Sequence, residues 1–144
     1  MLFLPFPAIQ EVVPHKEEMV LLDQIIEHDS NGTVCTVTIG PHSIFQNSKG
    51  HVPAWVGIEY MAQCIAVFAG MRARSKDEKI QIGYLLGSRY LEIFDKDFIQ
   101  GQTLEIRCKL IKEDNNIGVF QCEVFDAGNH ALLLKGNLNV YRHN

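Results

Sequence analysis

The side chains with the clearest capacity for chemistry are a carboxylate and an amide in an otherwise apolar stretch. Between residues 54 and 71 the only strongly polar side chains are Glu59 and Gln63. If this stretch is a helix, they share one face, because they are four residues apart. Burial raises the pKa of a carboxyl group unless a hydrogen bond stabilises the charge, so Glu59 is a candidate for proton transfer near neutral pH. The alternative is a structural carboxylate that Tyr60, Gln63 or a facing backbone group satisfies.

Two histidines precede this stretch and offer a partner for proton transfer. His42 lies seventeen residues before Glu59, and His51 lies eight residues before it. A histidine suits acid–base work with a carboxylate because its own pKa is close to neutrality. The first N–H groups of the helix, at 54–56, have no partner within the helix, and the positive end of its dipole favours a polarised carbonyl oxygen. These groups together indicate proton abstraction next to a thioester carbonyl.

The helix that carries Glu59 is apolar on every face apart from the two polar side chains and the Tyr60 hydroxyl. Such a helix lies inside a protein core or inside a membrane. Eighteen residues are at the short limit for a membrane span, and both flanking regions show strand patterns. We therefore expect a helix wrapped by a sheet, with no membrane association.

Strand patterns account for most of the remaining chain. A short helix is expected at 8–13 and a loop at 40–52. Two strands before the central helix, joined by a turn at 29–32, form a hairpin. Two strands, one buried helix and about four antiparallel strands define an α+β arrangement in a single domain, 1–144. The strands are expected at 19–28, 33–39, 80–94, 103–112, 119–125 and 130–141, with bends at Gly83 and Gly87.

Composition and missing motifs exclude several classes of protein. The net charge of −4 gives no indication of nucleic-acid binding. The cysteines stand alone, and the apolar N-terminus has no basic leader, so we expect a cytoplasmic protein. The sequence contains no Gly-rich phosphate loop, GxSxG, HExxH or CxxC motif. We therefore expect no nucleotide cofactor, no metal and no serine nucleophile.

Two segments resemble a known family. The segment PHKEEMVLLDQIIE resembles the PHRYPFLLVDRV segment of the hotdog-fold 3-hydroxyacyl-[acyl carrier protein] dehydratases of the FabZ and FabA type. The segment PAWVGIEYMAQ resembles their PGVLILEAMAQ helix, and it is more similar still to the ApeP-like branch of aryl polyene biosynthesis. The resemblance implies a hotdog fold, in which a curved antiparallel sheet encloses a long helix. It also implies a dimer, either of identical chains or with a related dehydratase.

The resemblance implies a mechanism and roles for individual residues. In this family a histidine of one subunit faces the acidic helix residue of the other. The histidine removes a C2 proton from a 3-hydroxyacyl chain carried on acyl carrier protein (ACP), and the acidic residue, with an ordered water, assists departure of the 3-hydroxyl. Glu59 maps onto the acidic residue, and Gln63 onto the glutamine that orients it. Backbone N–H groups at the helix start, Ala54 and Trp55, are expected to hold the thioester oxygen.

The chain departs from the family pattern at two positions. The family histidine lies closer to the acidic residue than His42 does, whereas His51 lies too close to match. We choose His42 because the context IGPHSIF is similar to the end of the strand before the family histidine. Ala54 replaces the family glycine after the helix proline, which crowds the approach to the thioester.

Three functions fit these residues. The first is dehydration of 3-hydroxyacyl-ACP to trans-2-enoyl-ACP. The second is a hotdog thioesterase, which also uses a helix carboxylate and a helix N-terminus but does not need His42. The third is a non-catalytic partner subunit of a heterodimeric dehydratase, which the Ala54 replacement and the displaced histidine keep open. The fate of the substrate separates these functions: loss of water, release of a free thiol, or neither.

Overall fold

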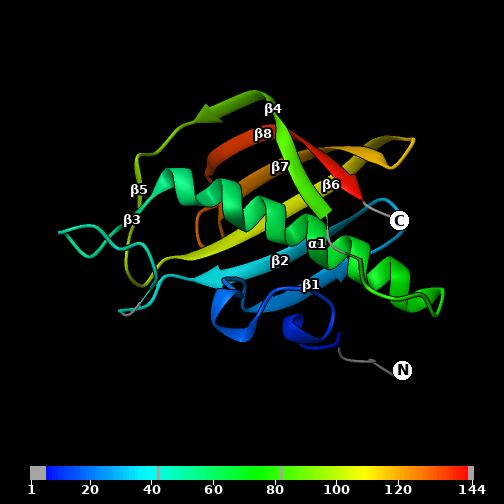
Figure 1. The fold of residues 1–144 in the computed structure, drawn as a ribbon. Helices are drawn as coiled ribbons and strands as arrows, with labels where there is room; N and C mark the ends of the chain where they lie inside the picture. The colour runs from blue at the N-terminus through cyan, green and yellow to red at the C-terminus, as the bar shows by residue number, and fades with distance from the viewer. Residues whose placement is uncertain (1–5, 42, 82, 143–144) are drawn as a thin grey trace.

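The central helix is the longest element of the structure. A computed structural model describes residues 6–41, 43–81 and 83–142 (Figure 1). Helix α1 covers Gly57–Ser75 and follows directly on a 3-10 turn, η3 (Ala54–Val56). The predicted helix is confirmed, with a C-terminal end at Ser75. The other elements are η1 (Ile9–Glu11), η2 (Glu17–Met19), β1 (Gln24–His28), β2 (Gly32–Thr38), β3 (Val52–Pro53), β4 (Gly83–Ile93), β5 (Asp97–Phe98), β6 (Thr103–Asp114), β7 (Ile117–Asp126) and β8 (Leu132–Arg142).

Six of the strands form one antiparallel sheet in the order β1-β2-β6-β7-β8-β4. The predicted hairpin before the helix is confirmed as β1 and β2. Helix α1 lies across one face of the sheet and contacts β6, β2 and β7 most closely (Figure 1). This placement leaves β4, at one edge of the sheet, with little cover from the helix. The expected α+β arrangement of a sheet around one helix is confirmed.

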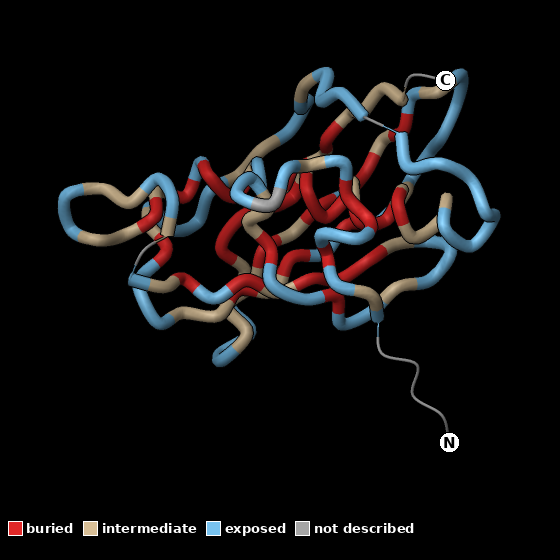
Figure 2. Tube along the Cα trace, turned by 60° about the horizontal axis from the view of Figure 1, so that its bottom comes forward, coloured by how far each residue is buried: buried red, intermediate tan, exposed pale blue. Residues whose placement is uncertain are grey.

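The core lies between α1 and the sheet, where the buried stretches of chain gather (Figure 2). Met61, Val67 and Phe68 of the helix are fully buried. The stretch Ala54–Ser75 is long and apolar enough to cross a membrane, but 61% of its most apolar window is buried inside the protein. The apolar surface of the helix is therefore explained by the sheet that covers it.

All four cysteines lie in this core as free thiols, one each on β2, α1, β6 and β7. Burial raises the pKa of the Cys64 thiol well above its usual value, and the neighbouring Cys108 and Cys35 raise it further. Burial also raises the pKa of Cys122. The Cys64 and Cys122 thiols therefore stay protonated, and all four cysteines pack as small apolar groups. No metal-binding cluster of His, Cys, Asp or Glu occurs among the described residues.

The first predicted strand is the main difference in secondary structure. We expected a strand over 19–28, but β1 begins only at Gln24. The Met19 carbonyl and the Leu21 N–H form hydrogen bonds with the Gln63 side chain of α1 instead of with a strand. The β3/β5 ladder was not predicted, because two residues per strand are too few to show a period.

Strand β4 is exposed along nearly its whole length. Gly87 has a φ of 153°, and the register with β8 shifts between Leu85 and Gly87, so the predicted bend is a β-bulge. Large apolar side chains of β4 remain in contact with solvent, among them Leu86, with 58% of its surface exposed, and Tyr84, with 52%. Exposed edge strands pair unspecifically unless a bulge, a charge or a covering element protects them.

Candidate functional site

Glu59 projects from the first turns of α1 and is exposed in this chain. The expectation of a carboxylate buried by its own chain is therefore wrong. The side chain points away from the helix face that meets β2, β6 and β7, where the neighbouring Tyr60 and Met61 are buried. Any desolvation of the Glu59 carboxylate must come from a bound substrate or from another chain.

Gln63 is the buried polar residue beside Glu59, with 1% of its surface exposed. Its amide Nε2 donates to Glu59 Oε1 at 3.1 Å and to the Met19 carbonyl at 2.8 Å. Its Oε1 accepts from the Leu21 N–H at 2.9 Å. Because a backbone N–H can only donate, Leu21 fixes the orientation of the amide, and the NH₂ group must face Glu59.

The bond from Gln63 determines what the Glu59 carboxyl group can do. Oε1 is held as an acceptor, which leaves Oε2 as the oxygen that can carry and deliver a proton. The bonds from Gln63 also connect two segments that lie far apart in the sequence. Gln63 of the helix segment and residues 19–21 of the upstream PH…LLD segment form one hydrogen-bonded unit.

Replacing Gln63 by Leu is expected to destabilise the fold strongly. The variant leaves the Leu21 N–H and the Met19 carbonyl facing an apolar side chain without partners, at a cost of about 1–3 kcal/mol for each group. Urea unfolding at fixed protein concentration should show the lower midpoint. Gln121→Leu, at an exposed position of β7, is the matched control and should change stability by less than about 0.5 kcal/mol. Equal midpoints for both variants would contradict the assigned role of the Gln63 bonds.

The helix start differs from the expectation in one respect. The Ala54 N–H donates to the Lys96 carbonyl at 2.8 Å, so the expectation that this N–H is free for a ligand is wrong. The bond belongs to the contact that β3 and β5 make beside the helix start. The N–H of Trp55, the next along the chain, has no hydrogen-bond acceptor among the described residues. The Trp55 side chain is 58% exposed and packs against Phe45, with ring centroids 6.0 Å apart.

The structure describes only one of the two candidate histidines. His42 lies outside the described residues, so its role as the base stays a prediction. His51 Nδ1 lies 3.3 Å from Asp97 Oδ2 of β5, and both side chains are about one-third exposed. The His51 backbone N–H and carbonyl are bonded to Asn47. His51 thus connects the loop to the β3/β5 ladder, and the choice between the two histidines stays a prediction.

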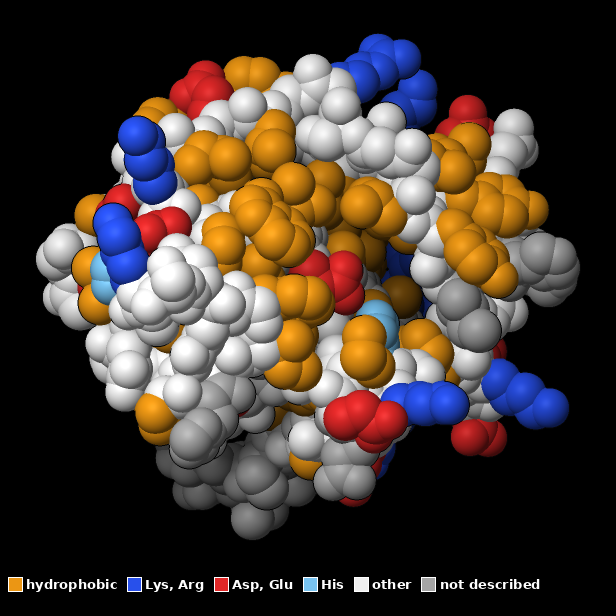
Figure 3. Space-filling model, turned by 60° about the vertical axis from the view of Figure 1, so that its left-hand side comes forward, with side chains coloured by type: hydrophobic (Ala, Val, Ile, Leu, Met, Phe, Trp, Pro, Cys, Tyr) orange, Lys and Arg blue, Asp and Glu red, His pale blue; other side chains and the backbone are white. Residues whose placement is uncertain are grey.

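A cleft of about 230 Å³ begins at Glu59 and runs between α1 and the strands β4, β7 and β8. Its walls are mainly apolar and include Ala66 of the helix, Leu85 of β4 and Val140 of β8. Figure 3 shows a face of the molecule where hydrophobic side chains gather around an acidic side chain and a hollow. The strand residues of this wall were not assigned from the sequence, because strand periodicity does not reveal which helix face they meet.

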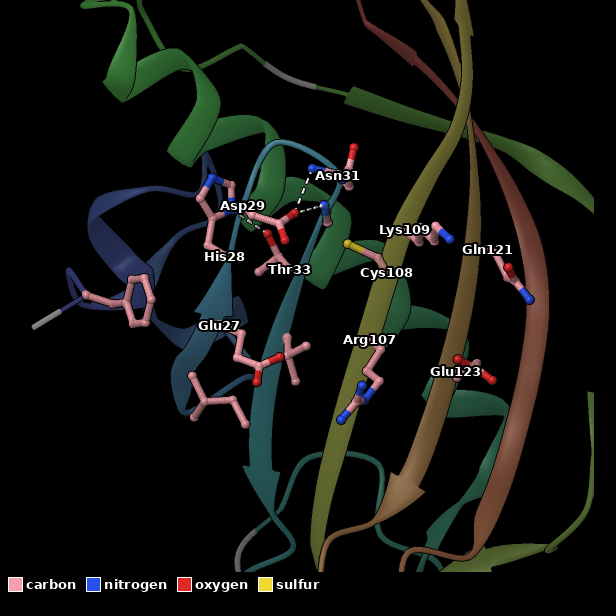
Figure 4. A pocket seen from close by; sticks show the side chains of 14 residues that line it. Glu27, His28, Asp29, Asn31, Thr33, Arg107, Cys108, Lys109, Gln121 and Glu123 are labelled. Atoms are coloured by element: carbon pink, nitrogen blue, oxygen red, sulfur yellow. Dashed lines mark hydrogen bonds between the residues drawn. The ribbon is translucent and has the colours of Figure 1, made fainter.

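A second, wider hollow of about 750 Å³ lies over β1, β2, β6 and β7 (Figure 4). Some of its polar groups bond within the β1–β2 hairpin: Asp29 accepts the Asn31 and Gly32 N–H groups, and His28 Nδ1 is 2.7 Å from the Thr33 hydroxyl. Burial lowers the pKa of His28, which favours the neutral ring. This open surface contains neither Glu59 nor Gln63, and we assign no chemistry to it.

A long helix on an antiparallel sheet, with a carboxylate beside an apolar cleft, defines a hotdog-fold enzyme. The sequence profile of the ApeP-like family, described as ApeP dehydratase, matches residues 7–144. A solved structure, the dehydratase heterocomplex ApeI:P from Xenorhabdus doucetiae, contains a chain that is 34% identical, with a TM-score of 0.89 over 96% of this chain and 93% of that one. The protein belongs to the ApeP-like dehydratases, as its sequence indicated.

More distant relatives agree with this assignment. The 3-hydroxyacyl-[acyl-carrier-protein] dehydratase FabZ of Streptococcus gordonii is 28% identical over 81% of this chain and 83% of its own length. The FabZ of Campylobacter jejuni is 28% identical over 84% of this chain and 86% of its own length. The E. coli PaaI protein, at 13% identity and a TM-score of 0.66 over 82% of this chain and 81% of its own, shares the fold alone.

Proposed function

We propose that this dehydratase acts on 3-hydroxyacyl chains carried on ACP and releases trans-2-enoyl-ACP, in fatty acid or aryl polyene biosynthesis. The observation that carries the proposal is the Glu59 carboxyl group, which buried Gln63 orients at the mouth of an apolar cleft. The FabZ names of the relatives support the substrate class. Buried free thiols are typical of a reducing compartment, so we place the enzyme in the cytoplasm.

In the proposed reaction, His42 takes the proton from C2 of the substrate. The electron pair of that C–H bond forms the C2–C3 double bond, and the C3–O bond breaks. Glu59, protonated at Oε2, delivers its proton to the departing hydroxyl, which leaves as water. The thioester oxygen gains negative charge during proton removal, and the Trp55 N–H at the helix start is the donor we assign to it. Ala54 and the Trp55 ring then form the walls around the thioester.

We propose that a second chain completes this site. The cleft at Glu59 is bounded on one side by Leu85 of the uncovered edge strand β4. Exposed apolar side chains on this strand favour a partner that pairs with β4. The partner is a second copy or a related dehydratase, a choice that the similar chain of the ApeI:P dehydratase heterocomplex supports. Pairing at β4 would bring the partner's loop at 40–52 near the mouth of the cleft.

A charge on β4 is expected to break this assembly. Leu86→Lys places an ammonium group in the proposed contact, where an unpaired charge cannot be desolvated. Sedimentation at micromolar concentration should show a dimer for the unchanged chain, alone or mixed with its related dehydratase, and a monomer for the variant. Ile111→Lys, at an equally exposed position of β6, is the control and should leave the mass unchanged. An unaltered dimer in the Leu86 variant would exclude β4 as the contact.

The experiment that tests the function follows the fate of 3-hydroxyacyl-ACP substrates in the presence of the assembled protein. Enoyl formation without thiol release supports the dehydratase. Release of free ACP thiol would identify the chain as a thioesterase, an alternative that the shared hotdog fold leaves open. If neither product forms but the chain raises the rate of an added related dehydratase, the chain is the non-catalytic partner subunit.

A further inference from the structure

The cleft at Glu59 continues along a single stripe of α1. Its helix wall includes Glu59, Ala62, Ala66, Ala69 and Arg72, at the three- and four-residue spacing of one helix face, with Ile65 beside them. At a rise of about 1.5 Å per residue, the stripe extends roughly 20 Å from the carboxylate to the arginine. Three alanines leave room beside the helix, so an extended chain bound at Glu59 would point toward Arg72.

An ion pair between Arg72 and Glu113 lines the far end of the cleft, where the two side chains are 22% and 41% exposed. Arg72 Nη1 and Nη2 donate to Glu113 Oε1 and Oε2 at 3.1 and 2.6 Å. The Arg72 guanidinium also lies 5.2 Å from the centre of the Phe68 ring, which fixes its orientation. The hydrogen bonds from Arg72 lower the pKa of Glu113, and the charges of Arg72 itself, Arg142 and Lys76 lower it further. The pair therefore stays charged at neutral pH.

We propose that the Arg72–Glu113 pair is the end stop that sets the longest acyl chain this enzyme accepts. The inference rests on the proposed function, because it takes the acyl chain to lie in the cleft at Glu59. Apolar walls favour each added methylene, which should tighten binding roughly fourfold. A methyl end that reaches the ion pair must separate or desolvate two charges, which is unfavourable. Affinity should thus rise with chain length and then fall abruptly.

The test uses saturated acyl-pantetheine thioesters of increasing length, which bind without being dehydrated. Thermal shifts of the assembled full-length protein report their affinity. The chain length at which affinity falls abruptly is the break in the profile. Ala69→Leu narrows the cleft before its end and should move this break to shorter chains. The double variant Arg72→Leu/Glu113→Leu removes both members of the ion pair, so that neither is left without the other, and should move the break at least two carbons longer. Ala73→Leu, beside the stripe but outside the cleft, is the control and should keep the original break.

The outcomes separate this inference from the proposed function. An unchanged break in the Arg72→Leu/Glu113→Leu variant would overturn the end stop, whether or not enoyl product forms. Conversely, a break that moves to longer chains in this double variant supports the end stop even if the dehydration assay fails. In parallel turnover assays with 3-hydroxyacyl-ACP, the preferred length should shift in the same direction as the binding break.

Discussion

Glu59→Gln is expected to lower the rate of enoyl formation by about 10²–10⁴-fold, the usual cost of losing a positioned acid–base group. The amide has nearly the shape of the carboxyl group, and its oxygen can still accept the bond from Gln63 Nε2. It has no acidic proton to give to the departing 3-hydroxyl. The chain should therefore keep its fold and assembly while the chemical step fails. Single-turnover kinetics with saturating substrate measure the chemical step directly.

The control for this variant is Glu78→Gln, which alters an exposed carboxylate beyond the end of α1. It should keep the full rate. Unfolding midpoints of both variants should match that of the unchanged protein. A Glu59 variant with full activity would exclude the carboxyl group from the mechanism.

His42→Ala is expected to show a loss of the same order, about 10²–10⁴-fold in enoyl formation, because it removes the proposed base for the C2 proton. His51→Ala should cost less than tenfold. The side chains of His51 and Asp97 are 30% and 31% exposed, and such pairs contribute little to stability. Backbone bonds to Asn47 still hold the loop in the His51 variant. Both variants should be assayed at equal concentration of assembled protein.

The comparison of the two histidine variants also tests which of them corresponds to the family histidine. If His51→Ala inactivates the enzyme while His42→Ala keeps the full rate, His51 with its Asp97 contact is the base. If both variants remain active and Glu59→Gln does not, the reaction needs only the carboxyl group. The thioesterase alternative then becomes the better description.

The local parts of the site could be predicted from the sequence, whereas the long-range parts could not. The four-residue spacing of Glu59 and Gln63 predicts their contact on one helix face, and the hydrogen bond confirms it. No periodicity indicates that Gln63 also binds the backbone at 19–21, so the first strand was predicted too long. In the same way, the acceptor of the Ala54 N–H is the carbonyl of Lys96, far along the chain.

Burial was harder to predict than secondary structure. The apolar residues around Glu59 indicated a buried carboxylate, but the helix covers the sheet unevenly and leaves Glu59 on the side of β4. The strand predicted over 80–94 is confirmed, but nothing in its sequence indicates that most of its residues remain exposed. A single sequence does not record which surfaces a second chain covers.

The strand order of the sheet has a consequence for synthesis of the chain. Among the described strands, β4 pairs only with β8, which follows β6 and β7 in the chain and is synthesised after them. Translation proceeds at about 5–20 residues per second, so β4 waits for several seconds after its own synthesis while β6 and β7 are made. During this interval its apolar side chains and both backbone edges are unpaired, which makes the nascent chain prone to aggregate. Chaperone binding during translation should therefore be strongest between completion of β4 and emergence of β8.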